Sequence, residues 1–233
     1  MPGSAGRPAR LPDCAGPRWP SSIAEAAALQ DELRPLVDTA GPGPRTIATA
    51  AGVDVAYRPG SDRVTAAAVV LDAGTLHAVE ARTAEGRAGF AYRTGFLAFR
   101  ELPAILTVLR ALTSTPDLLV CDGAGLAHPR RFGLACHLGV LADVPTIGVA
   151  KTPNGAYRPP AEPRGSWTDL IDSGDVVGRA LRTQDGVRPV FVSVGHRIDL
   201  DTACAHVLAL SRRHRLPETT RQADRLARAA ALR

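Results

Sequence analysis

Three acidic residues in separate stretches of the chain are the strongest candidates for chemistry. Asp54 lies in an otherwise apolar stretch, Glu101 lies at the start of an amphipathic pattern, and Asp122 directly follows the apolar run 118–120. Carboxylates from several elements, without thiolates or clustered histidines, suit a hard cation such as Mg²⁺ or Mn²⁺ rather than zinc. With basic residues alongside, they indicate a phosphodiester substrate, in which the ion would assist attack by water and stabilise the leaving oxygen.

Asp122 belongs to the stretch 121–131, which reads Cys-Asp-Gly-Ala-Gly-Leu-Ala-His-Pro-Arg-Arg. A carboxylate at the carboxyl end of a buried strand, followed by glycines, His128 and two arginines, can hold a cation next to a phosphate. The alternative is that Asp122 only caps the next element. This stretch alone leaves both interpretations open.

Lys151 is the only lysine among the 28 basic residues of the chain, and it directly follows the apolar run 146–150. Arginine carries a planar fork, whereas lysine is a compact charge that fits a tight site. The exception therefore indicates that a guanidinium would not serve at this position, although chance retention of one lysine is the alternative.

The apolar patterns predict an α/β fold. Period-two alternation predicts a strand over 47–57 that places Asp54 on the face opposite Val53 and Val55. Short turns then join it to two further strands, which gives an antiparallel three-strand meander. A strand, a helix and a strand follow as a βαβ unit, so that Asp122 and Lys151 emerge at the same edge of the sheet. The remaining predicted strands are 64–71, 76–83, 118–121, 146–150, 176–183 and 189–194, with an irregular segment over 152–174.

Helices are predicted to flank this mixed sheet. Pro103 is tolerated only in the first turn of a helix, so Glu101 is expected at the start of a helix over 100–112. No linker divides the chain, so residues 21–233 are expected to form one domain after a poorly ordered tail over 1–20. The other predicted helices are 23–37, 132–143, 201–213 and one that begins near 219.

Composition excludes several classes of protein. The 45% hydrophobic content is sufficient for a core, and four cysteines without a CxxC pair indicate neither a zinc site nor a disulfide framework. No apolar run reaches the length of a membrane span, and the first residues lack the apolar block of a secretory signal, so we expect a cytoplasmic protein.

The net charge of +5 comes from the last part of the chain, since residues 212–233 contain seven arginines and two acids. Such a run fits a polyanionic partner, although a solvated helix face is the commoner meaning.

Six blocks in this order resemble the endonuclease V family, the deoxyinosine-directed nucleases. The blocks are Gly-Val-Asp-Val-Ala-Tyr at 52–57, Gly-Phe-Leu-Ala-Phe-Arg-Glu at 95–101, the segment 117–139, Ile-Gly-Val-Ala-Lys at 147–151, Gly-His-Arg at 195–197 and the segment 216–225. The resemblance implies a ribonuclease-H-like fold and Mg²⁺-dependent cleavage at the second phosphodiester 3′ to deoxyinosine, which leaves 3′-hydroxyl and 5′-phosphate ends. It also implies a role in DNA repair.

The resemblance also implies roles for single residues. Asp54 and Asp122 match the principal metal-binding carboxylates of the family, and Glu101 matches its third acid. The family pattern further implies that His196 lies near the metal, that Asp117 supports the site, and that His128 and Lys151 contact phosphate. Substrate binding is implied for Tyr92, Gly95, Gly123, Gly125 and Arg130, with the three glycines around a flipped-out hypoxanthine.

The loop that carries Tyr92 departs from the family pattern. It reads Ala-Tyr-Arg-Thr at 91–94 and lacks the two prolines of the usual Pro-Tyr-Ile-Pro wedge. We expect a monomeric nuclease for deoxyinosine DNA, and the altered loop makes inosine-containing RNA or single strands the alternative target. The arginine-rich end also leaves open a non-catalytic nucleic-acid-binding module.

Overall fold

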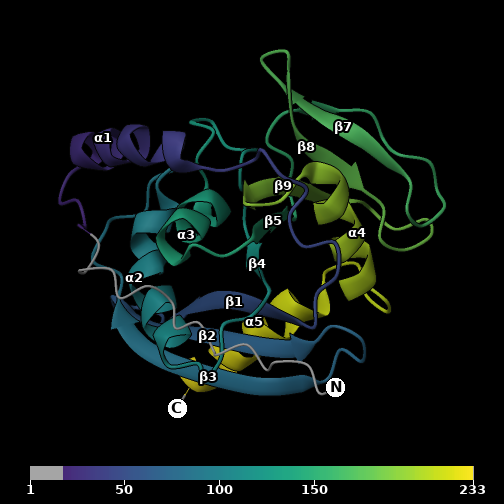
Figure 1. Ribbon diagram of the computed structural model, residues 1–233. Helices are drawn as coiled ribbons and strands as arrows, with labels where there is room; N and C mark the ends of the chain where they lie inside the picture. The colour runs from purple at the N-terminus through teal and green to yellow at the C-terminus, as the bar shows by residue number, and fades with distance from the viewer. Residues whose placement is uncertain (1–17, 233) are drawn as a thin grey trace, which may run out of the picture.

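The computed structural model describes residues 18–232. A nine-stranded mixed sheet forms the centre of the molecule, in the order β3-β2-β1-β4-β5-β9-β8-β7-β6 (Figure 1). The strands β1 (Thr49–Tyr57), β2 (Arg63–Asp72) and β3 (Ala78–Arg87) are antiparallel neighbours. The predicted meander is therefore confirmed.

The predicted βαβ unit is also confirmed. β4 (Leu118–Asp122) pairs in parallel with both β1 and β5 (Thr146–Ala150), and α3 (Leu134–Ala142) connects β4 to β5. Asp122 is the last residue of β4, and Lys151 follows β5 directly. Both residues therefore lie at one edge of the sheet.

Helices cover both faces of the sheet (Figure 1). On one face, α2 (Leu97–Arg110) and α3 enclose a core with the odd-numbered residues of β1, including Val53 and Val55. On the other face, α4 (Leu200–Leu210) packs near β9, and α5 (Glu218–Ala231) packs on the even-numbered residues of β1. Asp54 thus faces α5, as the alternation predicts.

The start of α2 differs from the prediction. The helix begins at Leu97, so Glu101 lies in its second turn and Pro103 lies in its interior. Proline cannot donate to the carbonyl four residues earlier. The additional turn is stabilised by the burial of Phe99, whose ring packs against Phe90 and Phe96.

The segment expected to be irregular contains two strands. β6 (Ala156–Tyr157) and β7 (Trp167–Asp172) pair antiparallel with each other, and β7 pairs with β8 (Asp175–Leu181). β8 then pairs with β9 (Val190–His196). The sequence did not indicate β6 and β7 because the first has only two residues and the second is half polar and lies near the periphery of the sheet.

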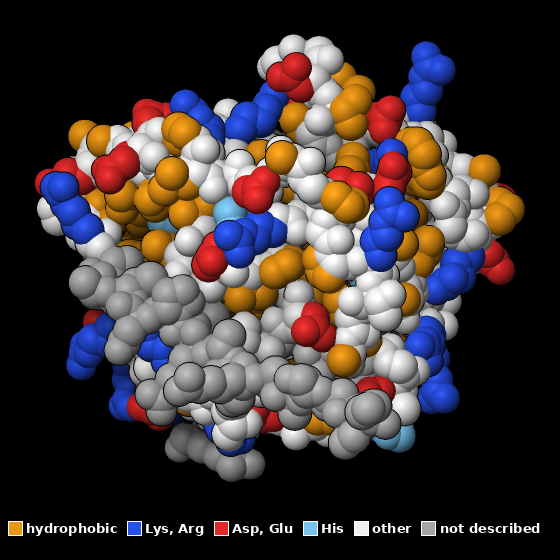
Figure 2. Space-filling view, viewed as in Figure 1, with side chains coloured by type: hydrophobic (Ala, Val, Ile, Leu, Met, Phe, Trp, Pro, Cys, Tyr) orange, Lys and Arg blue, Asp and Glu red, His pale blue; other side chains and the backbone are white. Residues whose placement is uncertain are grey.

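At the amino-terminal side, Ser22 caps α1 (Ile23–Leu33), and a 3-10 turn over Arg34–Leu36 follows. Most of the tail expected over 1–20 lies outside the described residues, but Trp19 packs against the core. None of the helices within 18–232 is long and apolar enough to cross a membrane. On the face drawn in Figure 2, acidic and basic side chains are interspersed.

Candidate active site

Acidic side chains gather at the carboxyl ends of β1 and β4. Val53 pairs with Cys121 in the parallel register, so Asp54 and Asp122 occupy the next position on adjacent strands. Both side chains project toward the face covered by α5, since the even-numbered residues of both strands point there. Glu101 comes from α2 on the other side of the sheet.

Burial and mutual repulsion both disfavour the ionised forms of these carboxylates. Burial, together with the charges of Asp122, Asp224 and Glu101, raises the pKa of Asp54 to about 7. Burial also raises the pKa of Glu101 to about 7, with a contribution from Asp122. A site with excess negative charge and only oxygen donors has the chemistry that a hard divalent cation requires.

Two of the acids contact other side chains. Asp122 accepts a hydrogen bond from Lys151 Nζ. Glu101 Oε1 accepts a hydrogen bond of 2.9 Å from the hydroxyl of Tyr57, and the Arg100 guanidinium lies 4.9 Å from the centre of the Tyr57 ring. Within residues 18–232, no three His, Cys, Asp or Glu side chains are grouped as a metal cage. The donor types fit a divalent cation, and each of these two hydrogen bonds is accepted by only one oxygen of its carboxylate.

Asp224 is a fourth acid at this edge, and the sequence analysis assigned it no role. It lies on α5, its charge raises the pKa of Asp54, and it accepts a 2.7 Å hydrogen bond from Arg228. Gly52 allows α5 to approach, because a Cβ at that position would lie 2.1 Å from the Thr219 carbonyl oxygen. A glycine inside a strand was the available signal of close backbone approach.

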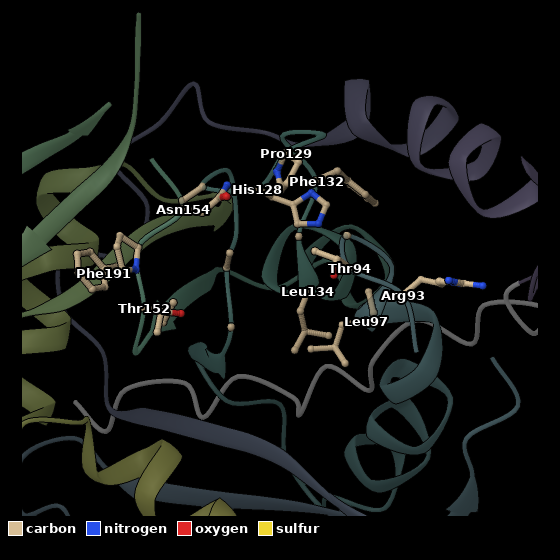
Figure 3. Close-up of a pocket in the computed structure, with 18 of the residues that line it drawn as sticks. Arg93, Thr94, Leu97, His128, Pro129, Phe132, Leu134, Thr152, Asn154 and Phe191 are labelled. Atoms are coloured by element: carbon tan, nitrogen blue, oxygen red, sulfur yellow. The ribbon is translucent and has the colours of Figure 1, made fainter. Parts of the chain in front are cut away.

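A pocket of about 340 Å³ adjoins the acidic edge. Gly123, which follows Asp122, lines it together with Gly95, whose φ of +85° favours glycine. Figure 3 shows Thr152, Asn154 and Phe191 on one side of the pocket and Leu97 and Leu134 on the other. The remaining lining is mostly apolar or glycine, and it includes Tyr92, Arg93, Thr94, Ala98, Ala124, Ala127, His128, Pro129, Phe132, Gly133, Ala150, Pro153 and Leu170.

His128 and Tyr92 both line this pocket. Burial lowers the pKa of His128 to about 4, so its imidazole is neutral at physiological pH. Its Nδ1 accepts a 3.2 Å hydrogen bond from the Arg130 amide. The ring of Tyr92 is 68% exposed and is therefore free to stack on a base.

Gly125 and Arg130 lie beside the pocket rather than in its lining. A Cβ on Gly125 would lie 1.9 Å from the Val194 carbonyl oxygen, so this glycine permits the loop to pack on β9. The Arg130 guanidinium contacts α1, with hydrogen bonds of 2.7 Å to Asp31 and 3.0 Å to the Ala27 carbonyl.

His196 is not at the acidic edge, so its expected place near the metal is wrong. β9 runs antiparallel to β5, and His196 pairs with Thr146, the first residue of β5. Its Nδ1 accepts a 3.1 Å hydrogen bond from the Asp38 amide, and its Nε2 lies 3.7 Å from Asp143 Oδ1. Burial lowers the pKa of this histidine, with a further contribution from Arg197.

Asp117 also lies at the opposite edge. Its Oδ2 accepts hydrogen bonds of 2.8 Å from the Ala48 amide and 2.9 Å from the Thr49 amide. These bonds fix the amino end of β1 beside the amino end of β4. Any support that Asp117 gives to the acids is therefore exerted through the register of these two strands.

The sequence comparison decides the family. A sequence model described as Endonuclease V matches residues 31–225. The chain belongs to the endonuclease V family. Endonuclease V of Streptomyces avermitilis is 59% identical over 215 residues, which cover 91% of this chain and 93% of that protein.

Solved endonuclease V structures share the fold. The crystal structure from Streptomyces avermitilis has a TM-score of 0.89 at 59% identity, covering 91% of this chain and 94% of that one. Human ENDOV has a TM-score of 0.82 at 33% identity, covering 91% and 98%. Endonuclease V of Ciona intestinalis, in complex with DNA containing an inosine followed by a ribo-adenosine, has a TM-score of 0.80 at 28% identity and covers 90% and 97%. As a member of the endonuclease V family, the protein is a nuclease.

Proposed function

We propose that this endonuclease V is a Mg²⁺-dependent DNA repair enzyme that recognises deoxyinosine. It cleaves the second phosphodiester on the 3′ side and leaves 3′-hydroxyl and 5′-phosphate ends. The observation that carries this proposal is the position of a 340 Å³ glycine-walled pocket directly beside the acidic edge. The complex of the Ciona intestinalis relative with inosine-containing DNA supports the choice of base.

The strand arrangement supports a ribonuclease-H-like assignment of the fold. An antiparallel meander is followed by two parallel strands, with helices on both faces. This arrangement brings the carboxylates of Asp54 and Asp122 to adjacent strand ends. In open α/β sheets, the carboxyl ends of parallel strands are where ligands bind.

Asp54, Asp122, Glu101 and Asp224 would hold the cation, with Mn²⁺ as an alternative to Mg²⁺. When bound, the ion supplies Lewis acidity at a phosphoryl oxygen and neutralises the repulsion among the acids. Lys151 then becomes available to the scissile phosphate, because its present partner is Asp122. Its ammonium provides a compact positive charge for a phosphoryl oxygen.

The pocket would receive the base after it leaves the stack. Gly95 and Gly123 allow the backbone to approach a planar ring closely. The imidazole of His128 is neutral, which suits an uncharged base. The exposed Tyr92 can stack in the space from which the base departs. Base recognition and phosphate chemistry thus occupy adjacent sites.

An oligonucleotide cleavage assay tests the proposal. A labelled duplex with one deoxyinosine is incubated with Mg²⁺ and the wild-type protein, and the expected result is one nick at the second phosphodiester 3′ to the lesion. Asp122→Asn should abolish the nick. Asp72→Asn, which alters an aspartate of β2 paired with Thr49 at the other edge, should leave it unchanged. Equal cleavage by wild type and Asp122→Asn would refute the proposal.

A second candidate function is cleavage of inosine-containing RNA or single strands. Two observations favour it: the loop around Tyr92 lacks the usual prolines, and the Ciona intestinalis complex contains a ribo-adenosine after the inosine. Parallel assays on duplex DNA, single-stranded DNA and RNA with the same sequence decide between the targets. Faster cleavage of the duplex DNA would exclude the second candidate.

A further inference from the structure

The two walls of the base pocket are carried by different parts of the chain. The loop between β4 and α3 provides one wall, including His128 and Phe132. The segment from the end of β5 through β7 provides the other, including Asn154 and, within β7, Leu170. His128 and Asn154 both line the pocket (Figure 3). The distance between these walls determines which base can enter.

The wall that carries Asn154 depends on the tip of the β7–β8 hairpin. Ala156, two residues after Asn154, pairs with Ile171 near that tip. Gly155 has a φ of +129°, and a Cβ there would lie 2.7 Å from the Ile171 carbonyl oxygen. The position of the hairpin tip therefore sets the position of Asn154.

The hairpin tip has little support from the sheet. β8 pairs with β9 only through Arg179, Ala180 and Leu181, so the first residues of β8 extend beyond β9. Figure 1 shows the hairpin projecting from the body of the molecule. A small apolar cluster that includes Ala127 and Leu170 packs beneath it.

One guanidinium joins the tip to the opposite wall. Arg131 Nη1 forms an ion pair with Asp172, and its Nη2 donates 2.9 Å and 3.5 Å hydrogen bonds to the Asp172 carbonyl and to Asp175 Oδ2. The backbone of Arg131 has a φ of +54°, and its amide donates a 2.8 Å hydrogen bond to the His128 carbonyl. The same turn thus holds both His128 and the guanidinium that reaches the hairpin.

We propose that Arg131 is a positioning residue that fixes the spacing of the two pocket walls and thereby sets the selectivity for the base. Its guanidinium contacts Asp172 and Asp175 at the hairpin tip. The inference rests on the proposed function, because it assumes that the pocket receives the flipped base. We call the contacts of Arg131 with Asp172 and Asp175 the clamp. Loss of the clamp allows the pocket wall that carries Asn154 to move, which weakens binding of hypoxanthine and allows other bases to bind.

The test compares Arg131→Gln with Arg197→Gln. Arg197 is a matched control at the other edge of the sheet, since it has a φ of +51°, an ion pair of 2.9 Å with Asp143 and a 3.4 Å hydrogen bond to the Asp143 carbonyl. Cleavage of deoxyinosine duplexes is measured over a range of substrate concentrations, together with cleavage of duplexes that carry deoxyuridine or deoxyxanthosine at the same position.

Arg131→Gln should raise the KM for the deoxyinosine substrate about fivefold, with a smaller change in kcat, and should lower the preference for deoxyinosine. Asp172→Asn should produce the same change, and the double variant should add little to either one. Arg131→Lys should retain only part of the wild-type KM and selectivity, because an ammonium cannot bridge Asp172 and Asp175 as the planar guanidinium does. Arg197→Gln should behave as wild type.

The outcomes separate the inference from the proposed function. If wild type does not cleave deoxyinosine DNA, the proposed function fails. If wild type cleaves it and Arg131→Gln matches Arg197→Gln in KM and in selectivity, the clamp has no role. If Arg131→Gln does not fold, Asp172→Asn, which keeps the arginine and the carbonyl contact, decides the question by the same two measurements.

Discussion

Asp54→Asn should stabilise the metal-free protein at alkaline pH while abolishing cleavage. Burial and the neighbouring carboxylates raise the pKa of Asp54 from its ordinary value of 3.8 to about 7. The folded protein therefore binds more protons than the unfolded chain between these two values, so the free energy of unfolding falls as the pH rises through this window. Above about pH 7, where Asp54 is ionised in both states, its ionisation lowers the free energy of unfolding no further.

The magnitude follows from the size of the shift. One pKa unit corresponds to about 1.4 kcal/mol, so the rise of the Asp54 pKa from 3.8 to about 7 means that its ionisation costs the folded state on the order of 4 kcal/mol at pH 8. At pH 5 most of this cost is absent. Asparagine has nearly the same shape and no charge, so the stability of Asp54→Asn relative to wild type should rise by about 3 kcal/mol between pH 5 and pH 8.

Chemical denaturation in the presence of EDTA measures this gain. Asp72→Asn is a control of opposite sign, because hydrogen bonds from Thr75 lower the pKa of Asp72. This variant should therefore be less stable than wild type at pH 8, with the difference disappearing as the pH falls through the folded-state pKa. Added Mg²⁺ should stabilise wild type at pH 8 more than it stabilises Asp54→Asn. Equal stability of wild type and Asp54→Asn at both pH values would refute the electrostatic reasoning.

Three further substitutions test other parts of the site. Asp224→Asn should lower the single-turnover cleavage rate about 10- to 100-fold and weaken Mg²⁺ binding measured by calorimetry, and unchanged Mg²⁺ affinity would remove Asp224 from the acidic group. Lys151→Arg should lower the cleavage rate on the order of 10²-fold despite the retained charge, and wild-type rates would show that any cation suffices. Gly125→Ala should destabilise the fold by about 3 kcal/mol or more in thermal denaturation, whereas Gly41→Ala, whose Cβ would meet nothing within 4 Å, should not.

The sequence predicted the part of the fold that local pattern and connectivity determine. Alternation in β1 placed Asp54 opposite Val53 and Val55, and the βαβ unit placed Asp122 and Lys151 at one edge. In the structure Lys151 Nζ contacts Asp122 directly. These features could be inferred because a parallel crossover leaves only one edge available for the residues that follow both strands.

Features that depend on tertiary packing were not predictable in the same way. α2 begins one turn earlier than the position of Pro103 predicts, because burial of Phe99 stabilises the additional turn. A rule based only on the position of a proline takes no account of such burial. β7 is a strand because β6 and β8 supply its hydrogen bonds, although half of its own residues are polar. The error in the position of His196 has the same origin, since the direction of β9 is set by its pairing with β5.

Asp224 shows how a residue near the candidate site can be overlooked when the local pattern around it is interpreted correctly. The arginines at 221, 225 and 228 form a polar stripe on α5. Because this stripe explains the polar face of the helix, the local pattern indicates no separate role for Asp224. What makes Asp224 different is the close approach of α5 to β1, which Gly52 permits and which brings this carboxylate near Asp54. A glycine inside a strand and a helical acid are each weak signals alone. Only the register of α5 against β1 joins them, and that register follows from packing between segments about 170 residues apart in the sequence.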